Sequence, residues 1–238
     1  MTIPKERHVL VVFPHPDDEA FGVSGTISTH IKQGTPVTYA CLTLGEMGRN
    51  LGNPPFATRE SLPQIRKKEL IASAEAMGLT DLRMMGLRDK TVEFEDDEKM
   101  VGMMADLIKE LNPSLVITFY PNLSVHPDHE ATARAVVRAV RRMEDRPKLH
   151  CVAFANNTLD VLGNPDVVYD ISPVRDQKMG AMKAHISQTA WMLEEMEHKL
   201  AQGDTETENW LTKERFYNYR WDQDFEESFL AQTPLFSF

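Results

Sequence analysis

The sequence predicts an α/β fold, in which a Rossmann-like, doubly wound and mostly parallel sheet carries helices on both faces within a single domain. Continuous apolar, β-branched runs at residues 8–13 and 115–120 are typical of strands that are buried on both faces, as in parallel sheets. Strand and helix patterns alternate from residue 8 to about residue 143, which favours right-handed crossovers. A length of 238 residues suits one large domain of this class.

The first elements along the chain are the strand at 8–13 and a helical pattern at 18–33 that ends at Gly34. A second strand is expected at 37–42. Residues 43–63 then form a long segment rich in glycine and proline, without a helical or strand period. Because long loops in compact domains are often functional, we predict that this segment is a substrate loop.

The same alternation continues through the middle of the chain. Helices are expected at 65–77, 96–111 and 128–143, and strands at 82–85, 115–120, 149–155 and 167–171. Ser172 and Pro173 then resemble an N-cap and a proline at the first position of another helix. We find no internal repeat and no domain boundary, so residues 1–238 are predicted to form one domain.

The C-terminal part, residues 191–238, differs from the core at about 8–190. An acidic amphipathic helical pattern is followed by a tail with many aromatic side chains: Phe216, Tyr217, Tyr219, Trp221, Phe225, Phe229, Phe236 and Phe238. We expect this tail either to pack on the sheet or to form a subunit interface in a homo-oligomer, because aromatic residues are enriched in interfaces.

The composition excludes several classes of partner. A net charge of −10 argues against a basic surface for nucleic acid or anionic lipid. No apolar run approaches the ~20 residues that cross a bilayer, and the N-terminal residues do not resemble a signal peptide. Cys41 and Cys151 both lie in apolar runs, which is typical of buried, reduced thiols. We therefore expect a cytoplasmic protein that binds neither nucleic acid nor membrane.

Two clusters of imidazole and carboxylate groups directly follow two predicted strands. The first is His15–Glu19 (HPDDE), and the second is His126–Glu130 (HPDHE). In the usual order of an open α/β sheet these two strands are neighbours where the strand order reverses, and ligands bind beyond the carboxyl ends of the strands there. The two clusters are therefore expected to face one another.

These side chains could hold a divalent cation. A catalytic Zn²⁺ site uses three protein ligands and a water, which two histidines and one carboxylate from the two turns would satisfy. Such a site lowers the pKa of bound water toward ~7. A spare carboxylate could then take the proton of the water, and a spare histidine could stabilise charge opposite. We expect Zn²⁺, with Fe²⁺ or another divalent metal as the alternative.

Other interpretations compete with this one. Each cluster alone is also typical of a helix cap, since carboxylates stabilise the first turn of a helix. A metal phosphoesterase could use the same groups with Mg²⁺ or Mn²⁺, although two histidines and one aspartate suit a single Zn²⁺ or Fe²⁺ better. A nucleotide-binding module is disfavoured, because the first turn is acidic and lacks G-x-G-x-x-G. A serine hydrolase is disfavoured because Gly22–Gly25 (GVSG) lacks the G-x-S-x-G spacing.

The paired clusters resemble the motifs (A/P)HPDDE and HPDH of the PIG-L/LmbE-like zinc deacetylases. The similarity extends to Thr43–Glu46 (TLGE), to Arg66 and Glu69, and to residues 183–188, so that it covers about residues 8–190. Within that family the chain looks most like the deacetylases of bacillithiol biosynthesis, which act on the N-acetylglucosamine–malate conjugate. The resemblance implies hydrolysis of an N-acetyl group from this or another N-acetylated sugar or small molecule, with release of acetate and a free amine.

The resemblance also implies roles for individual residues. It assigns the metal to His15, Asp18 and His129. Asp17 would be the general base on the attacking water. His126 would stabilise the oxyanion or protonate the leaving amine, and Asp128 would orient a histidine.

Four further residues are candidates for contact with the small-molecule substrate: Glu46, Arg49, Arg59 and His185. Glu46 could accept hydrogen bonds from sugar hydroxyls, and the two arginines could pair with a carboxylate such as malate, which suits the guanidinium fork. His185 would close the site from the C-terminal half. Some relatives polarise the carbonyl with a tyrosine where this chain has Ser124, and Tyr120 is a candidate substitute.

Overall fold

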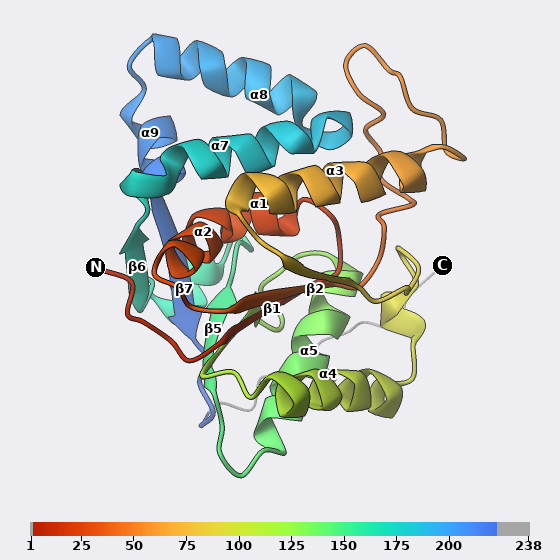
Figure 1. Cartoon of the computed structure of the whole chain (residues 1–238), viewed down its shortest axis with the longest axis vertical. Coiled ribbons are helices and arrows are strands. Elements are labelled where there is room, and N and C mark those ends of the chain that lie inside the picture. Colours follow the sequence, from red (N-terminus) through yellow and green to blue (C-terminus); the bar gives the residue numbers. More distant parts are fainter. Residues whose placement is uncertain (1, 223–238) are drawn as a thin grey trace.

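The computed structural model describes residues 2–222, and its framework is a seven-stranded mixed sheet with the order β3-β2-β1-β4-β5-β7-β6 (Figure 1). The strands are β1 (Val9–Phe13), β2 (Val37–Cys41), β3 (Asp81–Met84), β4 (Leu115–Phe119), β5 (Lys148–Val152), β6 (Val167–Asp170) and β7 (Lys213–Asn218). The first five are parallel, and β7 runs antiparallel to both β5 and β6. The strand order reverses between β1 and β4, as the sequence predicts.

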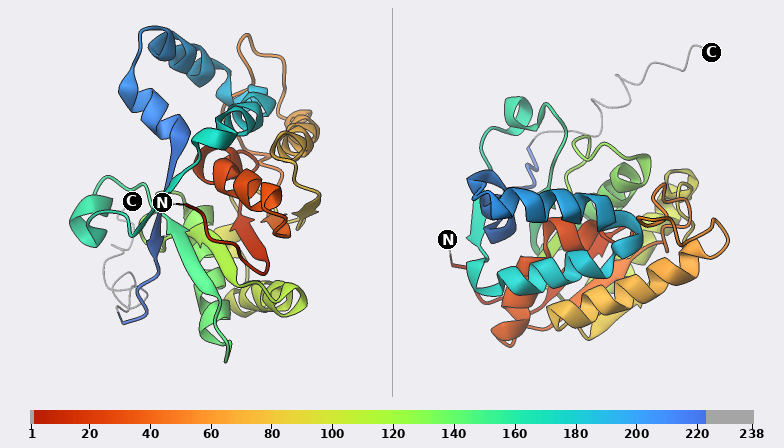
Figure 2. Two further views of the ribbon diagram at one scale, coloured as in Figure 1. Left: turned by 60° about the vertical axis from the view of Figure 1, so that its left-hand side comes forward. Right: turned by 90° about the horizontal axis from the view of Figure 1, so that it is seen from above.

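Helices cover both faces of the sheet, which confirms the predicted fold class (Figures 1 and 2). One face carries α1 (Asp18–Gly22), α2 (Ser24–Lys32), α3 (Leu62–Met77) and α7 (Arg175–Ala184), and the other carries α4 (Asp97–Leu111) and α5 (Pro127–Arg141). The helix α8 (Ile186–Ala201) lies beyond α7, farther from the sheet, and is followed by α9 (Thr205–Thr212). The short elements are α6 (Thr158–Leu162) and the 3₁₀ turns η1 (Val92–Phe94) and η2 (Ser172–Val174).

The position of strand β1 between two helical layers explains why its sequence is apolar at every residue. Val9, Val11 and Phe13 join the core beneath α2, α3 and α7, whereas Leu10 and Val12 join the core beneath α4 and α5. Successive side chains of a strand point to opposite faces, so a strand with helices on both sides must be apolar at every position.

Two features of the chain differ from the sequence prediction. The helix expected at 18–33 is two helices, α1 and α2, because the backbone leaves the helical region at Val23, where φ is −145° and ψ is 4°. Part of the aromatic tail is the strand β7, which inserts between β5 and β6. Its Phe216 and Tyr217, and Tyr219 just beyond it, are buried, since the inserted strand is covered on both faces.

Trp221 contacts Tyr219 at 4.7 Å between ring centroids, and the tail from residue 223 on, with Phe225, Phe229, Phe236 and Phe238, lies outside the described residues. The single-domain boundary at 1–238 and the alternative role of the tail in a homo-oligomer therefore stay predictions. Cys41 and Cys151 are buried free thiols, in agreement with the sequence. None of the helices in residues 2–222 combines the length and the apolar character needed to cross a bilayer.

Candidate metal centre and its cavity

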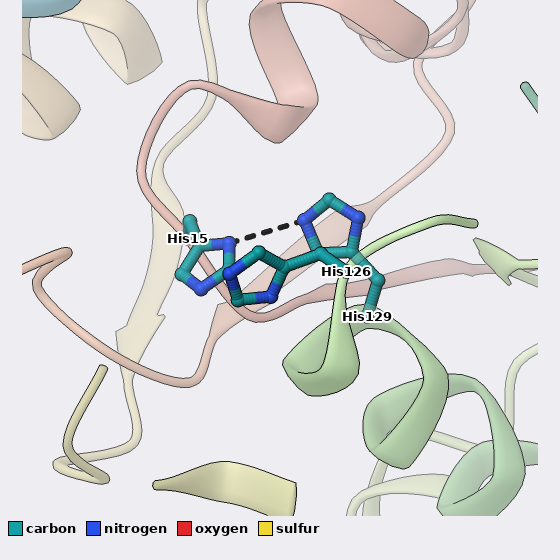
Figure 3. A group of neighbouring side chains, drawn as sticks. All are labelled: His15, His126 and His129. Carbon is teal, nitrogen blue, oxygen red and sulfur yellow. Dashed lines mark hydrogen bonds between the residues drawn. The ribbon is translucent and has the colours of Figure 1, made fainter. Parts of the chain in front are cut away.

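The two polar turns meet where β1 and β4 end side by side in the sheet (Figure 3). His15 lies in the turn between β1 and α1, and His129 lies in the first turn of α5. Nδ1 of His15 is 3.1 Å from Nε2 of His129, although 114 residues separate them in sequence. The predicted ligands therefore come together because β1 and β4 are neighbouring strands of the sheet.

Asp18 completes a triangle of potential ligand atoms. Its Oδ1 lies 3.3 Å from Nε2 of His129, and its Oδ2 lies 3.6 Å from Nδ1 of His15. Ligand atoms about 2.1 Å from a tetrahedral Zn²⁺ would be about 3.4 Å apart, so the observed spacing matches the size of such a site. A ring nitrogen of His126 also lies within 4.8 Å of nitrogens of His15 and His129, so it borders the same point.

The hydrogen bonds of the two ligand histidines determine which nitrogens are free. Nδ1 of His129 is 3.1 Å from the carbonyl oxygen of Ser124, so it donates its proton there. Nε2 of His15 faces Asp89 Oδ1 at 3.1 Å and Asp128 Oδ2 at 3.3 Å, so it too is a donor. In neutral imidazoles the remaining nitrogens are both acceptors. Two acceptor nitrogens 3.1 Å apart require a proton or a cation between them. This pair of facing acceptors shows that the residues fit a metal ion.

The electrostatics around His15 favour positive charge at this point. Burial lowers the pKa of His15, but its bonds to Asp128 and Asp89 outweigh burial and raise the pKa to about 10. Burial likewise opposes ionisation of Asp18, yet the nearby His129 and His15 hold the pKa of Asp18 below its usual value. A bound cation would displace the proton from His15, so its affinity must fall as the pH is lowered.

Asp17 stands beside the ligands in a strained backbone conformation. Its φ of 104° is rare for a residue other than glycine, and such strain is often found at functional sites. Nη2 of Arg66 donates to Asp17 Oδ2 over 2.9 Å, and Arg66 also donates to the carbonyl oxygens of Gly45 and Pro16. Burial raises the pKa of Asp17 to about 6, although Arg66 opposes this shift. The carboxylate is therefore a proton acceptor near neutral pH.

His126 is the N-cap of α5, and its tautomer is also determined by the structure. The backbone N–H of Asp128 donates to Nδ1 of His126 over 3.1 Å, so the proton of the neutral ring is on Nε2. Burial lowers the pKa of His126, and the neighbouring His15 and His129 lower it further. His126 therefore borders the site as a neutral hydrogen-bond donor.

These groups line a cavity of about 680 Å³. The lining residues are His15, Asp17, Asp18, Met47, Gly48, Arg49, Arg66, Asp89, Lys90, Glu93, His126, Pro127, His129 and Gln188. The substrate loop predicted at 43–63 supplies Met47, Gly48 and Arg49, so this loop does border the cavity. Asp128 is fully buried behind it, where it contacts His15 as expected for an orienting residue.

The other proposed substrate residues lie away from this cavity. Oε2 of Glu46 accepts the backbone N–H of Asp89 over 3.0 Å, and Arg59 donates to the carbonyl oxygen of Gly48 over 2.8 Å. Both side chains therefore hold loops instead of facing the cavity. His185 is fully buried beneath it, with Nε2 2.7 Å from Oε1 of Glu19, because this carboxylate needs a partner in the core. Of the four candidates, Arg49 alone is among the lining residues.

Neither Ser124, which occupies the position of the tyrosine in relatives, nor the suggested substitute Tyr120 is among the residues that line the cavity. Tyr120 is fully buried and packs on Tyr219 in the opposite core, at 5.5 Å between ring centroids. Ser124 donates its hydroxyl to Glu130 over 2.7 Å. The expectation that Tyr120 replaces the tyrosine of relatives is therefore wrong, since the strand direction turns its ring away from the site.

Sequence reasoning gave no role to Asp89 and Lys90, and it noted Arg66 only as part of a motif. Asp89 and Lys90 lie in the loop after β3, in a stretch with no periodic pattern and no repeated spacing. The motif pairing of Arg66 with Glu69 was the one signal for this residue, and the structure buries Arg66 to 3% exposure, where a guanidinium requires acidic or carbonyl partners. The sequence alone could not say which partners these are.

The sequence model of one protein family, PIG-L (GlcNAc-PI de-N-acetylase), matches residues 10–140. This match covers more than half of the chain. The chain belongs to the PIG-L family. PIG-L deacetylases are metal-dependent, in agreement with the His/Asp site described above.

Relatives within the PIG-L family match almost the whole chain. A probable N-acetyl-α-D-glucosaminyl L-malate deacetylase 2 of Bacillus cereus is 56% identical over 219 residues, which cover 91% of this chain and 100% of the relative. A protein of the same name from Bacillus subtilis is 51% identical, over 91% of this chain and 99% of the relative.

Solved structures share the fold at lower identity. The N,N'-diacetylchitobiose deacetylase of Pyrococcus horikoshii has a TM-score of 0.69 at 23% identity, covering 94% of this chain and 89% of its own. GalB, a 4-carboxy-2-hydroxymuconate hydratase of Pseudomonas putida, has a TM-score of 0.67 at 22% identity, covering 90% and 96%. Since a deacetylase and a hydratase both have this fold, the fold by itself does not decide the reaction.

Proposed function

We propose that this PIG-L protein is a metal-dependent deacetylase that hydrolyses the N-acetyl group of N-acetylglucosaminyl L-malate, releasing acetate and a free amine. Identity of 56% over the full length of a relative with this name supports the substrate. The observation that carries the chemistry is the convergence of Nδ1 of His15 and Nε2 of His129 on Asp18, with Asp17 beside them in one cavity.

We propose Zn²⁺ as the ion, held by His15, Asp18 and His129. Two imidazole nitrogens and one carboxylate oxygen, with space for a water, match the donor set of catalytic zinc sites, although Fe²⁺ accepts similar ligands. When bound, such an ion would polarise the acetyl carbonyl and lower the pKa of water. The cytoplasmic location expected from the sequence stays a prediction, and the two buried free cysteines are compatible with it.

The residues of the chain supply the proton transfers. Asp17 takes a proton from water as the water oxygen attacks the acetyl carbon, and Arg66 holds the carboxylate in place through its 2.9 Å bond. The pKa of about 6 lets Asp17 accept this proton near neutral pH and return it later. When the carbon–nitrogen bond breaks, Asp17 gives the proton to the departing nitrogen, so that a neutral amine and acetic acid leave. The acid then loses its proton to water and becomes acetate.

His126 acts on the other side of the acetyl group in this proposal. Because Asp128 N–H occupies its Nδ1, the ring presents Nε2–H, which donates to the oxygen that becomes negatively charged. Between the two roles that the sequence left open, this tautomer favours stabilisation of the oxyanion over protonation of the amine. The neutral ring needs no proton exchange during the reaction.

A direct assay tests the proposal. The zinc-loaded protein is incubated with N-acetylglucosaminyl L-malate, N,N'-diacetylchitobiose and a phosphate monoester, and free amine, acetate and inorganic phosphate are measured. We expect equal amounts of amine and acetate from the malate conjugate, loss of this activity with a chelator, and recovery when Zn²⁺ or Fe²⁺ is added. Phosphate release without amine release would instead show a phosphoesterase and contradict the proposal.

A further inference from the structure

Two cationic side chains at the mouth of the cavity have no polar partner among the residues that the structure describes. Arg49 and Lys90 line the cavity and are exposed to solvent, whereas His15 and His129 deeper inside are buried. Within residues 2–222, neither side chain forms an ion pair or a hydrogen bond. The third cation of the lining, Arg66, is committed to Asp17. The cavity mouth therefore holds two positive charges that are available to a ligand.

The backbone at both positions is held firmly by reciprocal bonds between two loops. Glu46 Oε2 accepts the backbone N–H of Asp89 over 3.0 Å, and Asp89 Oδ2 accepts the backbone N–H of Met47 over 2.8 Å. These bonds tie the segment that carries Arg49 to the segment that carries Lys90, so the two cations belong to one rim.

Lys90 is attached to the metal centre as well. Its backbone N–H donates to Asp128 Oδ2 over 2.7 Å, and that same oxygen lies 3.3 Å from Nε2 of His15. Lys90 also has a φ of 62°, which is uncommon for a side chain of this size. Residues in such backbone conformations cluster at active sites and ligand clamps, and the position of Lys90 beside the metal centre agrees with this.

The charges around these two residues make an anion the matching ligand. The chain carries a net charge of −10, so an anionic substrate is repelled at long range and needs local positive charge to bind. Among the acidic residues of the cavity, Asp17 is paired with Arg66, and Asp18 and Asp89 face the histidines. Glu93, which is exposed in the lining, is the one carboxylate there that opposes the two cations.

We propose that Arg49 and Lys90 form the specificity-determining pair that binds the carboxylates of the substrate's aglycone, outside the acetylated sugar. This inference rests on the proposed function and deepens it. The planar fork of Arg49 suits one carboxylate, and the point charge of Lys90 suits a second, so a dicarboxylate such as malate engages both. The sugar then extends inward, toward the buried histidines.

The test compares two substrates that differ only in charge. One is N-acetylglucosaminyl L-malate, and the other is its neutral diamide. For Arg49→Gln and Lys90→Gln we expect KM for the malate conjugate to rise by about tenfold or more, since each charge-assisted bond is worth that much in affinity. For the diamide we expect KM to stay within about twofold, and kcat to change little for either substrate. Lys90→Arg should restore most of the affinity for the malate conjugate.

Two further variants control for net charge and for the opposing carboxylate. Lys109→Met removes one exposed positive charge from α4, outside the cavity, and should leave KM unchanged for both substrates. Glu93→Gln should lower KM for the malate conjugate by about twofold to fivefold without affecting the diamide, because exposed charge pairs contribute little. In the wild type, added salt should raise KM for the malate conjugate alone.

The outcomes separate this inference from the proposed function. If the wild type deacetylates the malate conjugate, but Arg49→Gln and Lys90→Gln keep its KM or weaken both substrates equally, the pair does not recognise the carboxylates. If the wild type releases amine from neither conjugate, the result contradicts the proposed function itself. Since both side chains are exposed and form no hydrogen bond or ion pair within the described residues, we expect the variants to retain the wild-type melting temperature.

Discussion

Asp17 and Asp128 are both neighbours of the proposed metal ligands, but their surroundings are opposite. Asp17 borders the cavity and touches a guanidinium, whereas Asp128 is fully buried and touches an imidazole. Proton transfer suits the first position, and orientation of the imidazole suits the second. Substitution of each by asparagine removes the charge with little change of shape, so the two roles can be measured separately.

Asp17→Asn should abolish proton transfer and leave the metal in place. We expect kcat to fall by a factor of about 10² to 10⁴, the usual contribution of a general base. Asparagine tolerates positive φ, so the turn at φ 104° should persist. Steady-state kinetics and metal analysis of the same preparation check this. A variant with normal turnover would show that Asp17 is not the base.

Asp128→Asn should act on metal affinity instead. The carboxylate makes Nδ1 of His15 a better donor by accepting the proton of Nε2, and loss of such a partner typically costs about 10-fold to 100-fold in affinity. Competition against a chromophoric chelator measures the change. An unchanged affinity would contradict the orienting role, whereas a lower kcat at saturating metal would indicate an additional role.

At the scale of elements, helix α3 holds the catalytic turn in place. Arg66 in its first turns donates to Asp17, Pro16 and Gly45, which ties the turn after β1 to the start of the loop that follows β2. One turn further on, Glu69 accepts two bonds from Ser187 at the start of α8, at 2.7 Å each. Residues three apart on a helix share one face, so the same face of α3 fixes three separate segments.

Gly45→Ala tests this arrangement. Gly45 has a φ of 62°, and a Cβ there would overlap the guanidinium of Arg66, so the substitution should displace Arg66 and lower kcat by about tenfold or more through Asp17. Gly34→Ala is the matched control, because φ is 75° and nothing lies within 4 Å of an added Cβ. Left-handed backbone costs each alanine variant about 1 kcal/mol in stability. Equal activities of the two variants would contradict the role of Arg66.

At the scale of the whole molecule, two histidines are buried within the fold, away from the metal centre. His30 is fully buried and has no hydrogen-bond partner in the part of the chain that the structure describes, and His150 lies in β5. Burial lowers the pKa of each to about 4, although the nearby Glu6 opposes this. A histidine of the unfolded chain has a pKa of about 6.5, so between pH 6.5 and 4 the unfolded state binds more protons than the folded state.

The free energy of unfolding should therefore fall as the pH is lowered from 6.5 to 4. The limit is about 3 kcal/mol for each histidine, from 1.36 kcal/mol per pKa unit. His30→Leu removes one buried imidazole and should flatten this slope, with little loss of stability at pH 7 because no hydrogen bond is broken. Urea denaturation between pH 4 and 8 measures both curves. A variant with the wild-type slope would show that His30 is not responsible.

Much of the architecture and of the site follows from the sequence. The apolar run of β1 requires a strand covered on both faces, and the alternation of strands and helices then requires a parallel sheet. The strand order reverses between β1 and β4, so the two polar turns had to meet. Their donor types, two imidazoles and a carboxylate, favour Zn²⁺ or Fe²⁺ over Mg²⁺ as the ion. These conclusions follow from the residue pattern within each element and from the general topology of parallel sheets. Both can be inferred from the order of residues along the chain.

Only the tertiary structure decided which partner each polar group has. Glu46, Arg59 and His185 resembled substrate residues because their types suit a sugar acid, but neighbouring loops and the core use their hydrogen bonds instead. Lys90 carried no signal, yet the loop after β3 places it at the cavity mouth. Hydrogen bonds between distant segments depend on distances of a few tenths of an ångström, and no pattern along the chain records those distances.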